Sequence, residues 1–169
     1  MSKILICSPT YNESENIENF CKKILKIKNI DLIIIDDNSP DGTAKIIFKL
    51  QKKYKRLFII KRKKKLGIGS AIRTGMNYAL TKNYDAIITM DADLSHEPRE
   101  IPIFIKKIKK FDFVAGSRYM NGGKSDYKGY RDFISRLANI SCKFLLRMPF
   151  KEYTTSFRAY SNKSLKILK

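Results

Sequence analysis

Two carboxylates stand one residue apart in this strongly basic chain, where the segment MDADLSHEP follows the run AIIT at 86–89. Asp91 and Asp93 repel each other unless a positive group lies between them or both extend into solvent. If the strand-like run continues, both side chains point the same way and offer an oxygen site suited to Mg²⁺ or Mn²⁺ on a diphosphate. The structural alternative is a turn in which Asp91 caps a helix beginning near Pro98. The spacing alone leaves both interpretations open.

A second acidic segment, DDNSPDGT at 36–43, also follows an apolar run. Carboxylates such as Asp37 accept hydrogen bonds from nucleoside bases and riboses. The same residues equally fit a turn followed by a helix N-terminus. Pro9, Tyr11 and Glu13, from the segment PTYNE, either frame a base by stacking and hydrogen bonding or form a loop and a helix start.

Several other site classes are disfavoured. A dinucleotide motif beginning at Gly67 and Gly69 would need a third glycine at position 72, which is Ile72, and there is no P-loop motif. His96 is the only histidine and lacks a recognisable Ser or Cys partner, so a hydrolase triad is not expected. From its spacing, His96 either packs at a helix start or lines the loop that carries the two acids.

A basic cluster follows the last predicted strand. Arg118 and Arg131 lie at and beyond its exit, with Ser135 and Arg136 one helical turn further along. The planar guanidinium fork binds phosphate, so this cluster could receive a second, anionic substrate. The alternative is a solvated basic face, since the formal net charge of the chain is +19. That charge favours anionic partners but does not choose among them.

The elements that position these residues alternate between strands and helices. The apolar runs predict strands at 3–8, 31–36, 57–61, 85–90 and 111–115. The helical periodicity predicts helices at 13–27, 43–54, 69–82 and 98–110, with Asn12 and Glu15 as a capping box and Pro98 in a first helical turn. This alternation is typical of an α/β fold with a mostly parallel sheet, in which ligands gather at the carboxyl ends of the strands. All five predicted strands end in polar or charged residues, which predicts one site along that edge.

Length and composition indicate the number of domains, the role of the cysteines and the compartment of the protein. A chain of 169 residues predicts one domain with its own core. Cys7, Cys21 and Cys142 are odd in number and widely spaced, which favours packing roles in a reducing compartment. The N-terminal apolar run is too short for a signal peptide, and no stretch approaches the ~20 apolar residues that span a bilayer. We therefore expect a cytoplasmic protein, either soluble or peripheral to a membrane.

Taken together, six segments resemble family 2 glycosyltransferases in order and spacing, from residue 4 to about 160. They are PTYNE, DDNSPDGT, KKLGIGSA, MDADLSHEP, GSRY and SFRAY. The resemblance is strongest to polyprenol-phosphate sugar transferases of the dolichyl-phosphate mannosyltransferase type. It implies the GT-A fold, a Rossmann-like, mostly parallel sheet flanked by helices, as a single catalytic domain over 1–169 that is short at its C-terminus. It also implies inverting transfer of a hexosyl group, with mannose from GDP-mannose favoured, to polyprenyl or dolichyl phosphate.

The resemblance assigns roles by position. The nucleotide sugar would be held by Pro9, Tyr11, Glu13, Ile35, Asp37, Asp91 and Ala92. Mg²⁺ or Mn²⁺ would be held by Asp91, Asp93 and Ser95. The acceptor phosphate would be received by Arg118, Arg131 and Ser135, and the catalytic residues would be Asp93, Arg118 and Arg131. Many relatives have Gln where this chain has Ser95, and an Asp and a Gly where it has Glu152 and Thr155.

The implied partners are a nucleoside diphosphate sugar, a lipid phosphate and an anionic membrane surface at the cytoplasmic face, with no nucleic acid. Two alternatives remain. The first is a non-catalytic or differently specific nucleotide-sugar binder. The second is a phosphohydrolase using Asp91 as nucleophile and Asp93 as acid, which leaves DDNSPDGT unexplained. Chelation of metal should weaken nucleotide binding in a transferase, whereas nucleic-acid binding would depend steeply on salt.

Overall fold

The computed structural model describes residues 3–117, 134, 137, 139–141, 144 and 152–168. The chain divides into two compact units. The first contains Met1–Val114 and Phe157–Lys169, and the second contains Ala115–Ser156. Each unit is described by itself below.

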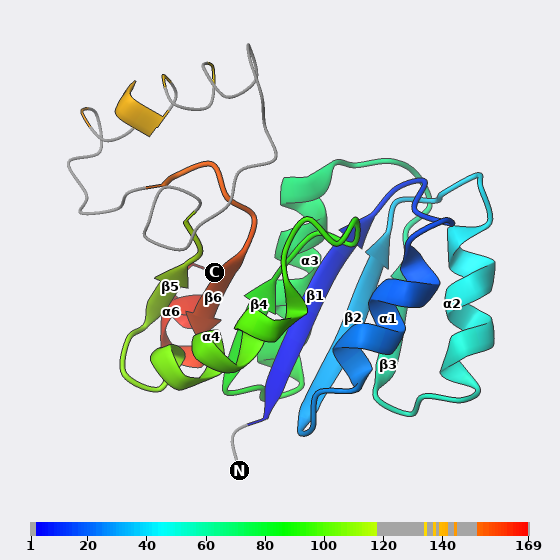
Figure 1. The fold of residues 1–169 in the computed structure, drawn as a ribbon, viewed down its shortest axis with the longest axis horizontal. Helices are drawn as coiled ribbons and strands as arrows, with labels where there is room; N and C mark the ends of the chain where they lie inside the picture. The colour runs from blue at the N-terminus through cyan, green and yellow to red at the C-terminus, as the bar shows by residue number, and fades with distance from the viewer. Residues whose placement is uncertain are drawn as a thin grey trace. The chain divides into compact units, whose positions relative to one another are not determined.

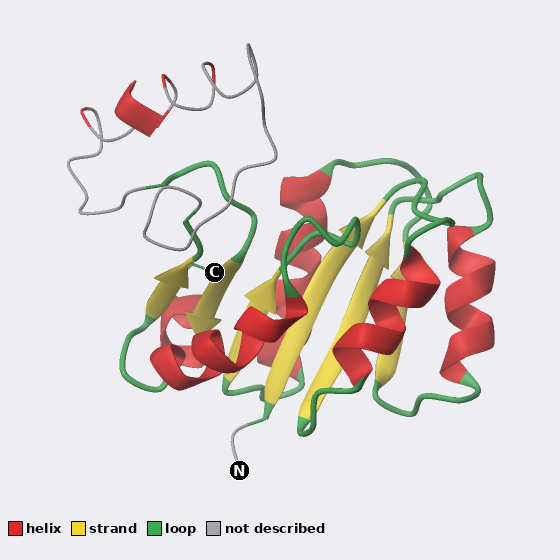
Figure 2. Cartoon of the chain, in the orientation of Figure 1, coloured by secondary structure: helices red, strands yellow, loops and turns green. Residues whose placement is uncertain are grey.

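A six-stranded sheet runs through the described residues in the order β3-β2-β1-β4-β6-β5 (Figures 1 and 2). Its strands are β1 (Ile4–Thr10), β2 (Ile30–Asp36), β3 (Leu57–Lys61), β4 (Ala86–Thr89), β5 (Phe113–Ala115) and β6 (Arg158–Ser161). β1 pairs in parallel with β2 and β4, and β2 pairs in parallel with β3. β6 runs antiparallel to β4. The predicted mostly parallel sheet is confirmed.

Helices cover both faces of the sheet. They are α1 (Ile17–Leu25), α2 (Thr43–Gln51), α3 (Ile68–Thr81), the short 3-10 helix η1 (Pro98–Glu100), α4 (Ile101–Ile108) and α6 (Asn162–Ile167). Successive residues of β1 point to opposite faces, so Ile6 packs with the core under α1, α2 and α4, and Leu5 with the core under α3 and α6. Figure 1 shows α1 and α4 in front of the sheet and α3 behind it. Both faces are buried, which explains why the central strands are nearly continuous runs of Ile and Leu.

The structure corrects the predicted helix start near residue 13. α1 begins at Ile17, and Asn12 adopts a left-handed conformation with φ 62° rather than capping the helix. Pro98 does begin a helical segment, as predicted. β6 and α6 were not predicted, because β6 is a short stretch, RAYS, without an apolar run. Its place in the sheet depends on pairing with β4, 69 or more residues away in the chain.

The described cysteines have the predicted packing role. Cys7 and Cys21 are free and buried, and burial raises the pKa of each thiol to about 12. Cys142 lies outside the described residues. Within the part of the chain that the structure describes, no helix has the length and apolar character needed to cross a bilayer.

Candidate functional site

An open pocket of about 250 Å³ lies at the carboxyl edge of the sheet in the first unit. It joins residues at the ends of β1, β2, β3 and β4. Its lining consists of Pro9, Thr10, Tyr11, Glu13, Asp37, Lys65, Gly67, Ile68, Asp91, Ala92 and Asp93. β2 and β4 flank β1 on opposite sides, so the pocket lies at the topological switch point, where open α/β sheets bind ligands.

The loop after β4 presents the paired acids to this pocket. The loop turns sharply, because Leu94 has φ 63° and the amide of Ser95 donates a 2.9 Å hydrogen bond to Oδ1 of Asp93. Asp91 does not cap the following helix, because the N-cap residue of η1 is Glu97. The structural alternative for Asp91 is therefore wrong, and its half-buried carboxylate faces the pocket with Asp93.

His96 attaches this loop to the core. Its Nδ1 accepts a 3.1 Å hydrogen bond from the amide of Asp91 and lies 3.9 Å from Oδ2 of the same residue. Its ring stacks on Phe157 with centroids 5.0 Å apart, and Phe157 stacks in turn on Phe104 at 4.1 Å. Both open interpretations of His96 therefore apply, since the ring packs against the core and also holds the backbone of the acidic loop.

The donor set fits Mg²⁺ or Mn²⁺ bound together with a phosphorylated ligand. No group of three or more His, Cys, Asp and Glu side chains converges among the described residues. A closed protein cage of such side chains is therefore not found there. Mg²⁺ is usually held by one or two carboxylates, with waters and substrate phosphates as its other ligands. Asp91 and Asp93 at a pocket wall satisfy that requirement.

The acids of DDNSPDGT have different partners. Asp36 is fully buried and accepts hydrogen bonds from Oγ1 of Thr10 and from the amide and hydroxyl of Ser39, so it joins the ends of β1 and β2. Asp41 accepts hydrogen bonds from the amide and hydroxyl of Thr43 at the start of α2 and from the amide of Ser14. Desolvation opposes ionisation of Asp41, but these hydrogen bonds outweigh it and lower its pKa to about 2. Turn chemistry accounts for these two acids.

Asp37 organises the loop after β3. One of its oxygens pairs with the Arg62 guanidinium, and the other accepts 2.9 Å hydrogen bonds from the amides of Leu66 and Gly67. Arg62 also donates to Oγ of Ser70 at 2.8 Å and to the carbonyl of Gly67 at 3.1 Å. The side chains of Asp37 and Arg62 are only 6% and 7% exposed, so this is a buried ion pair with further hydrogen bonds on both partners. We call Asp37, Arg62 and the 66–67 amides the β3-loop clamp.

The clamp places a cation over the PTYNE segment. Nζ of Lys65 lies 3.7 Å from the centroid of the Tyr11 ring. Tyr11 is exposed, whereas Glu13 is half-buried and its side chain accepts a 3.1 Å hydrogen bond from Nδ2 of Asn16. The pocket thus presents an aromatic ring, carboxylates and one lysine, which are groups that recognise a base, a sugar and a charged phosphate.

Most of the residues that the sequence predicted to bind the nucleotide sugar or the metal line this pocket. Ile35 and Ser95 do not line it: Ile35 is fully buried in the core facing α3, and Ser95 contributes its amide to the turn at Asp93. Arg118, Arg131 and Ser135 lie outside the described residues. Sequence reasoning did not assign Lys65 or Arg62. The signal was the KRKKK run, where charge alone does not distinguish the pocket lysine from its neighbours.

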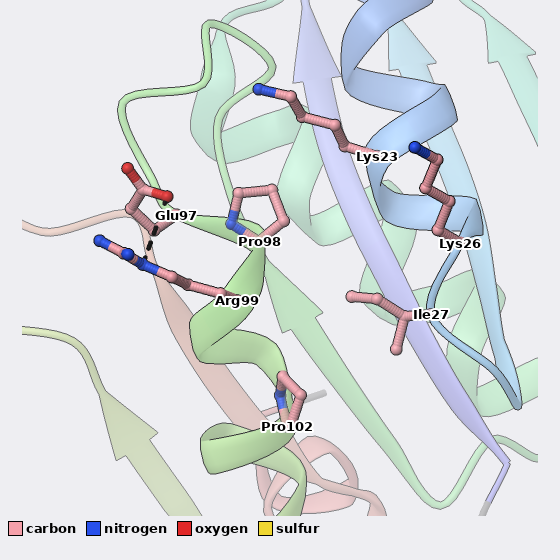
Figure 3. A pocket seen from close by; sticks show the side chains of 7 residues that line it. All are labelled: Lys23, Lys26, Ile27, Glu97, Pro98, Arg99 and Pro102. Carbon is pink, nitrogen blue, oxygen red and sulfur yellow. Dashed lines mark ion pairs between the residues drawn. The ribbon is translucent and has the colours of Figure 1, made fainter.

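A second and larger hollow, about 320 Å³, lies between α1 and the η1–α4 segment (Figure 3). It is lined by Lys23, Lys26, Ile27, Glu97, Pro98, Arg99 and Pro102. The only acid in this lining, Glu97, pairs with Arg99 at 3.6 Å, and both side chains are largely exposed. The smaller pocket is the better site candidate because it brings together acids, an aromatic ring and a cation from four strand ends.

In the second unit, the segment after residue 151 forms a small polar cluster. Asn139 accepts a 2.5 Å hydrogen bond from the amide of Tyr153 and donates a 3.2 Å bond to Oγ1 of Thr154. Glu152 is buried and accepts a 3.5 Å hydrogen bond from the same Thr154 hydroxyl. The buried carboxylate therefore has a hydroxyl partner within this unit.

Comparisons with known proteins identify the family of the chain. The chain matches the model of glycosyl transferase family 2 over residues 5–168. It is 29% identical over 168 residues to the undecaprenyl-phosphate mannosyltransferase of Micrococcus luteus, covering 98% of this chain and 69% of that protein. It is 31% identical over 167 residues to the polyprenol monophosphomannose synthase of Mycolicibacterium smegmatis, covering 96% and 63%. It is 39% identical over 139 residues to the dolichol-phosphate mannosyltransferase of Pyrococcus furiosus, covering 79% and 38%.

Two solved structures share the fold. The mannosyltransferase PcManGT from Pyrobaculum calidifontis, in complex with GDP-Man and Mn²⁺, aligns with a TM-score of 0.67 at 20% identity, over 98% of this chain and 46% of its own. The glucosyl-3-phosphoglycerate synthase of Mycobacterium tuberculosis, with Mn²⁺, UDP and phosphoglyceric acid, aligns with a TM-score of 0.71 at 18% identity, over 96% and 56%. These likenesses confirm the predicted GT-A type of fold.

The chain thus spans between 38% and 69% of the length of the three relatives described above. Within that span, the family match extends over nearly every residue and includes all four strand ends that build the pocket. The chain belongs to glycosyl transferase family 2.

Proposed function

We propose that this chain is an inverting hexosyltransferase that moves mannose from GDP-mannose to a polyprenyl phosphate. The observation that carries the proposal is the single pocket in which Tyr11, Asp37 and the Asp91–Asp93 pair converge from three strand ends. The relatives named above as mannosyltransferases or a monophosphomannose synthase, and the neighbour bound to GDP-Man, support the choice of mannose and guanine. We propose that both compact units belong to one catalytic domain.

In this proposal each group of pocket residues has one task. Tyr11 stacks on the base, while Glu13 and the Asp37 region accept hydrogen bonds from the nucleoside. Asp91 and Asp93 would hold Mg²⁺ or Mn²⁺ for the diphosphate, with waters and phosphate oxygens as its other ligands. The metal, when bound, neutralises the charge that develops on the departing nucleoside diphosphate. His96 accepts a hydrogen bond from the Asp91 amide, which helps to hold the acidic loop in the conformation that presents both carboxylates.

The acceptor phosphate needs to be positioned rather than deprotonated. A lipid phosphate is already ionised at neutral pH, so the attacking oxygen needs no general base. We propose that Arg118, Arg131 and Ser135 receive this phosphate, because guanidinium forks match phosphate oxygens.

We also propose that the protein acts peripherally at the cytoplasmic face of an anionic membrane. The charge of +19 attracts such a surface. In the second unit, Ile134, Leu137, Ile140 and Phe144 are helical and expose 46% to 81% of their surface. Their spacing of three or four residues is that of one apolar helix face, which suits contact with lipid.

The test is a calorimetric titration of GDP-mannose and UDP-glucose with and without Mn²⁺, followed by assay of mannosyl transfer to polyprenyl phosphate in vesicles. Asp93→Asn keeps an acceptor for the Ser95 amide but removes the charge, so it should abolish the gain in affinity from Mn²⁺. Glu18→Gln, an exposed acid on α1 outside the pocket, is the matched control. The site assignment is wrong if no nucleotide binds or if Asp93→Asn retains metal-dependent binding. Transfer to another acceptor class would refute the lipid-phosphate part alone.

A further inference from the structure

The ammonium of Lys65 covers the ring of Tyr11, and both residues line the donor pocket. A cation at 3.7 Å from a ring centroid is attracted by the negative face of the ring. That face is also the kind of surface on which a planar base stacks. The chain's own lysine therefore occupies stacking surface on a ring that lines the pocket.

The charges that line the pocket indicate a second partner for Lys65, the diphosphate of a bound nucleotide. Among the described residues that line the pocket, Lys65 is the only cation, beside the acids Glu13, Asp37, Asp91 and Asp93. A nucleoside diphosphate brings further negative charge into these surroundings. Among the described residues of the pocket lining, Lys65 is the group that can offer it positive charge.

The neighbouring basic residues are not equivalent to Lys65. The Arg62 guanidinium is buried and already donates to Asp37, Ser70 and the Gly67 carbonyl. Lys61, Lys63 and Lys64 are not among the residues that line the pocket. The β3-loop clamp thus fixes the backbone on both sides of Lys65, while its own side chain is exposed on a flexible stem.

We propose that Lys65 exchanges partners when the donor binds: its ammonium leaves the Tyr11 ring and binds the diphosphate, and the base takes the vacated ring. This inference rests on the proposed function, in which the pocket receives a nucleoside diphosphate sugar. Lys65 is then a specificity-determining residue. A nucleoside without phosphates must displace the ammonium but has no anionic group to bind it. A nucleoside diphosphate displaces the ammonium and also gives it a new anionic partner.

The experiment compares guanosine with GDP, both in the presence of Mn²⁺, on the wild-type chain, Lys65→Met and Lys23→Met. GDP binding is measured by calorimetry and guanosine binding by ligand-observed NMR. Lys23→Met is the control, because it removes the same charge from a lysine that lines the other hollow (Figure 3). Lys65→Arg tests whether a cation of different shape suffices.

Lys65→Met should bind guanosine about two- to fivefold more tightly, because an exposed cation–π contact no longer competes for the ring. It should bind GDP about tenfold more weakly, because a charge-assisted hydrogen bond to phosphate is lost. Lys23→Met should leave both affinities unchanged, and Lys65→Arg should retain most of the GDP affinity.

The partner exchange predicts that Lys65→Met raises the affinity for guanosine and lowers the affinity for GDP. If Lys65→Met shifts guanosine and GDP in the same direction, or shifts neither while the wild type binds GDP, the partner exchange is wrong and the proposed donor site stands. If the wild-type chain binds no GDP with Mn²⁺, the proposed function fails and this inference fails with it.

Discussion

The backbone amide of Asp91 donates a 3.1 Å hydrogen bond to Nδ1 of His96, and this bond connects the acidic loop to the Phe157–Phe104 stack. A ring nitrogen that accepts a hydrogen bond carries no proton, so this contact requires the other nitrogen to carry the proton of the neutral imidazole. The residue that positions the proposed metal ligand also packs on the hydrophobic core through Phe157.

His96→Phe separates these two roles, because it keeps an aromatic ring beside Phe157 but removes the acceptor for the Asp91 amide. We expect the affinity for Mn²⁺ with GDP to fall by about tenfold, as is typical when an outer-shell partner of a metal site is lost. Calorimetry of the ternary complex measures this, and the thermal midpoint should change little. Unchanged metal affinity would show that the Asp91 amide needs no acceptor at His96.

Asp37→Asn tests the β3-loop clamp. Removing one member of a buried ion pair leaves the other charge uncompensated, at a cost of about 3 kcal/mol or more. Urea denaturation should show this loss, and Arg62→Gln in the same chain should recover part of it. If the two substitutions destabilise additively, the pair is not coupled. If Asp37→Asn stays fully stable and loses only nucleotide binding, Asp37 acts as a ligand group alone.

Gly75→Ala tests the packing of α3 on β1. A Cβ on Gly75 would stand 2.2 Å from Sγ of Cys7. We expect the free energy of unfolding to fall by about 1–3 kcal/mol, as in other overpacked cores. Gly69→Ala on the same helix meets nothing within 4 Å and is the control, which should be neutral or slightly stabilising. Cys7→Ala combined with Gly75→Ala should restore part of the stability, and failure to do so would place the strain elsewhere.

Asp41 predicts a pH dependence of stability. Its pKa is lowered to about 2 in the folded chain from an ordinary value of 3.8, despite opposing desolvation, by hydrogen bonds from Thr43 and Ser14. A depressed pKa means that the ionised carboxylate stabilises the fold above pH 4. That contribution is lost as the pH falls from about 4 to 2. Urea denaturation should show Asp41→Asn to be less stable than wild type at pH 6, with the difference shrinking toward pH 2. A difference independent of pH would contradict the assignment.

Arg131→Ala addresses the part of the proposal that lies outside the described residues. We expect it to raise the KM for polyprenyl phosphate by more than it changes the Kd for GDP-mannose, because its proposed partner is the acceptor phosphate. Steady-state transfer kinetics and calorimetry measure the two quantities separately. The reverse order would move Arg131 to the donor side of the reaction.

Much of the fold was predictable because its signals are local. The continuous Ile and Leu runs of β1 and β2 identify strands buried on both faces, and parallel strands bring their carboxyl ends to one edge. That reasoning brought Pro9, Tyr11, Glu13, Asp37 and the Asp91–Asp93 pair together correctly. β6 was not predictable, since its four residues carry no apolar run and become a strand only through pairing with β4.

The sequence by itself determined the alternation of strands and helices, the edge where the polar residues collect and the family, because periodicity and motif order are properties of the chain. Only the tertiary structure decided what each charged side chain does there. Asp36 and Asp37 are neighbours in the sequence but have different partners. Asp36 accepts hydrogen bonds from Thr10 and Ser39, whereas Asp37 pairs with Arg62 and accepts a hydrogen bond from the amide of Leu66. The direction of a side chain and the partners it meets depend on segments distant in the chain, so Lys65 became distinguishable from the other lysines of its run only when β1 and β3 were assembled in one sheet.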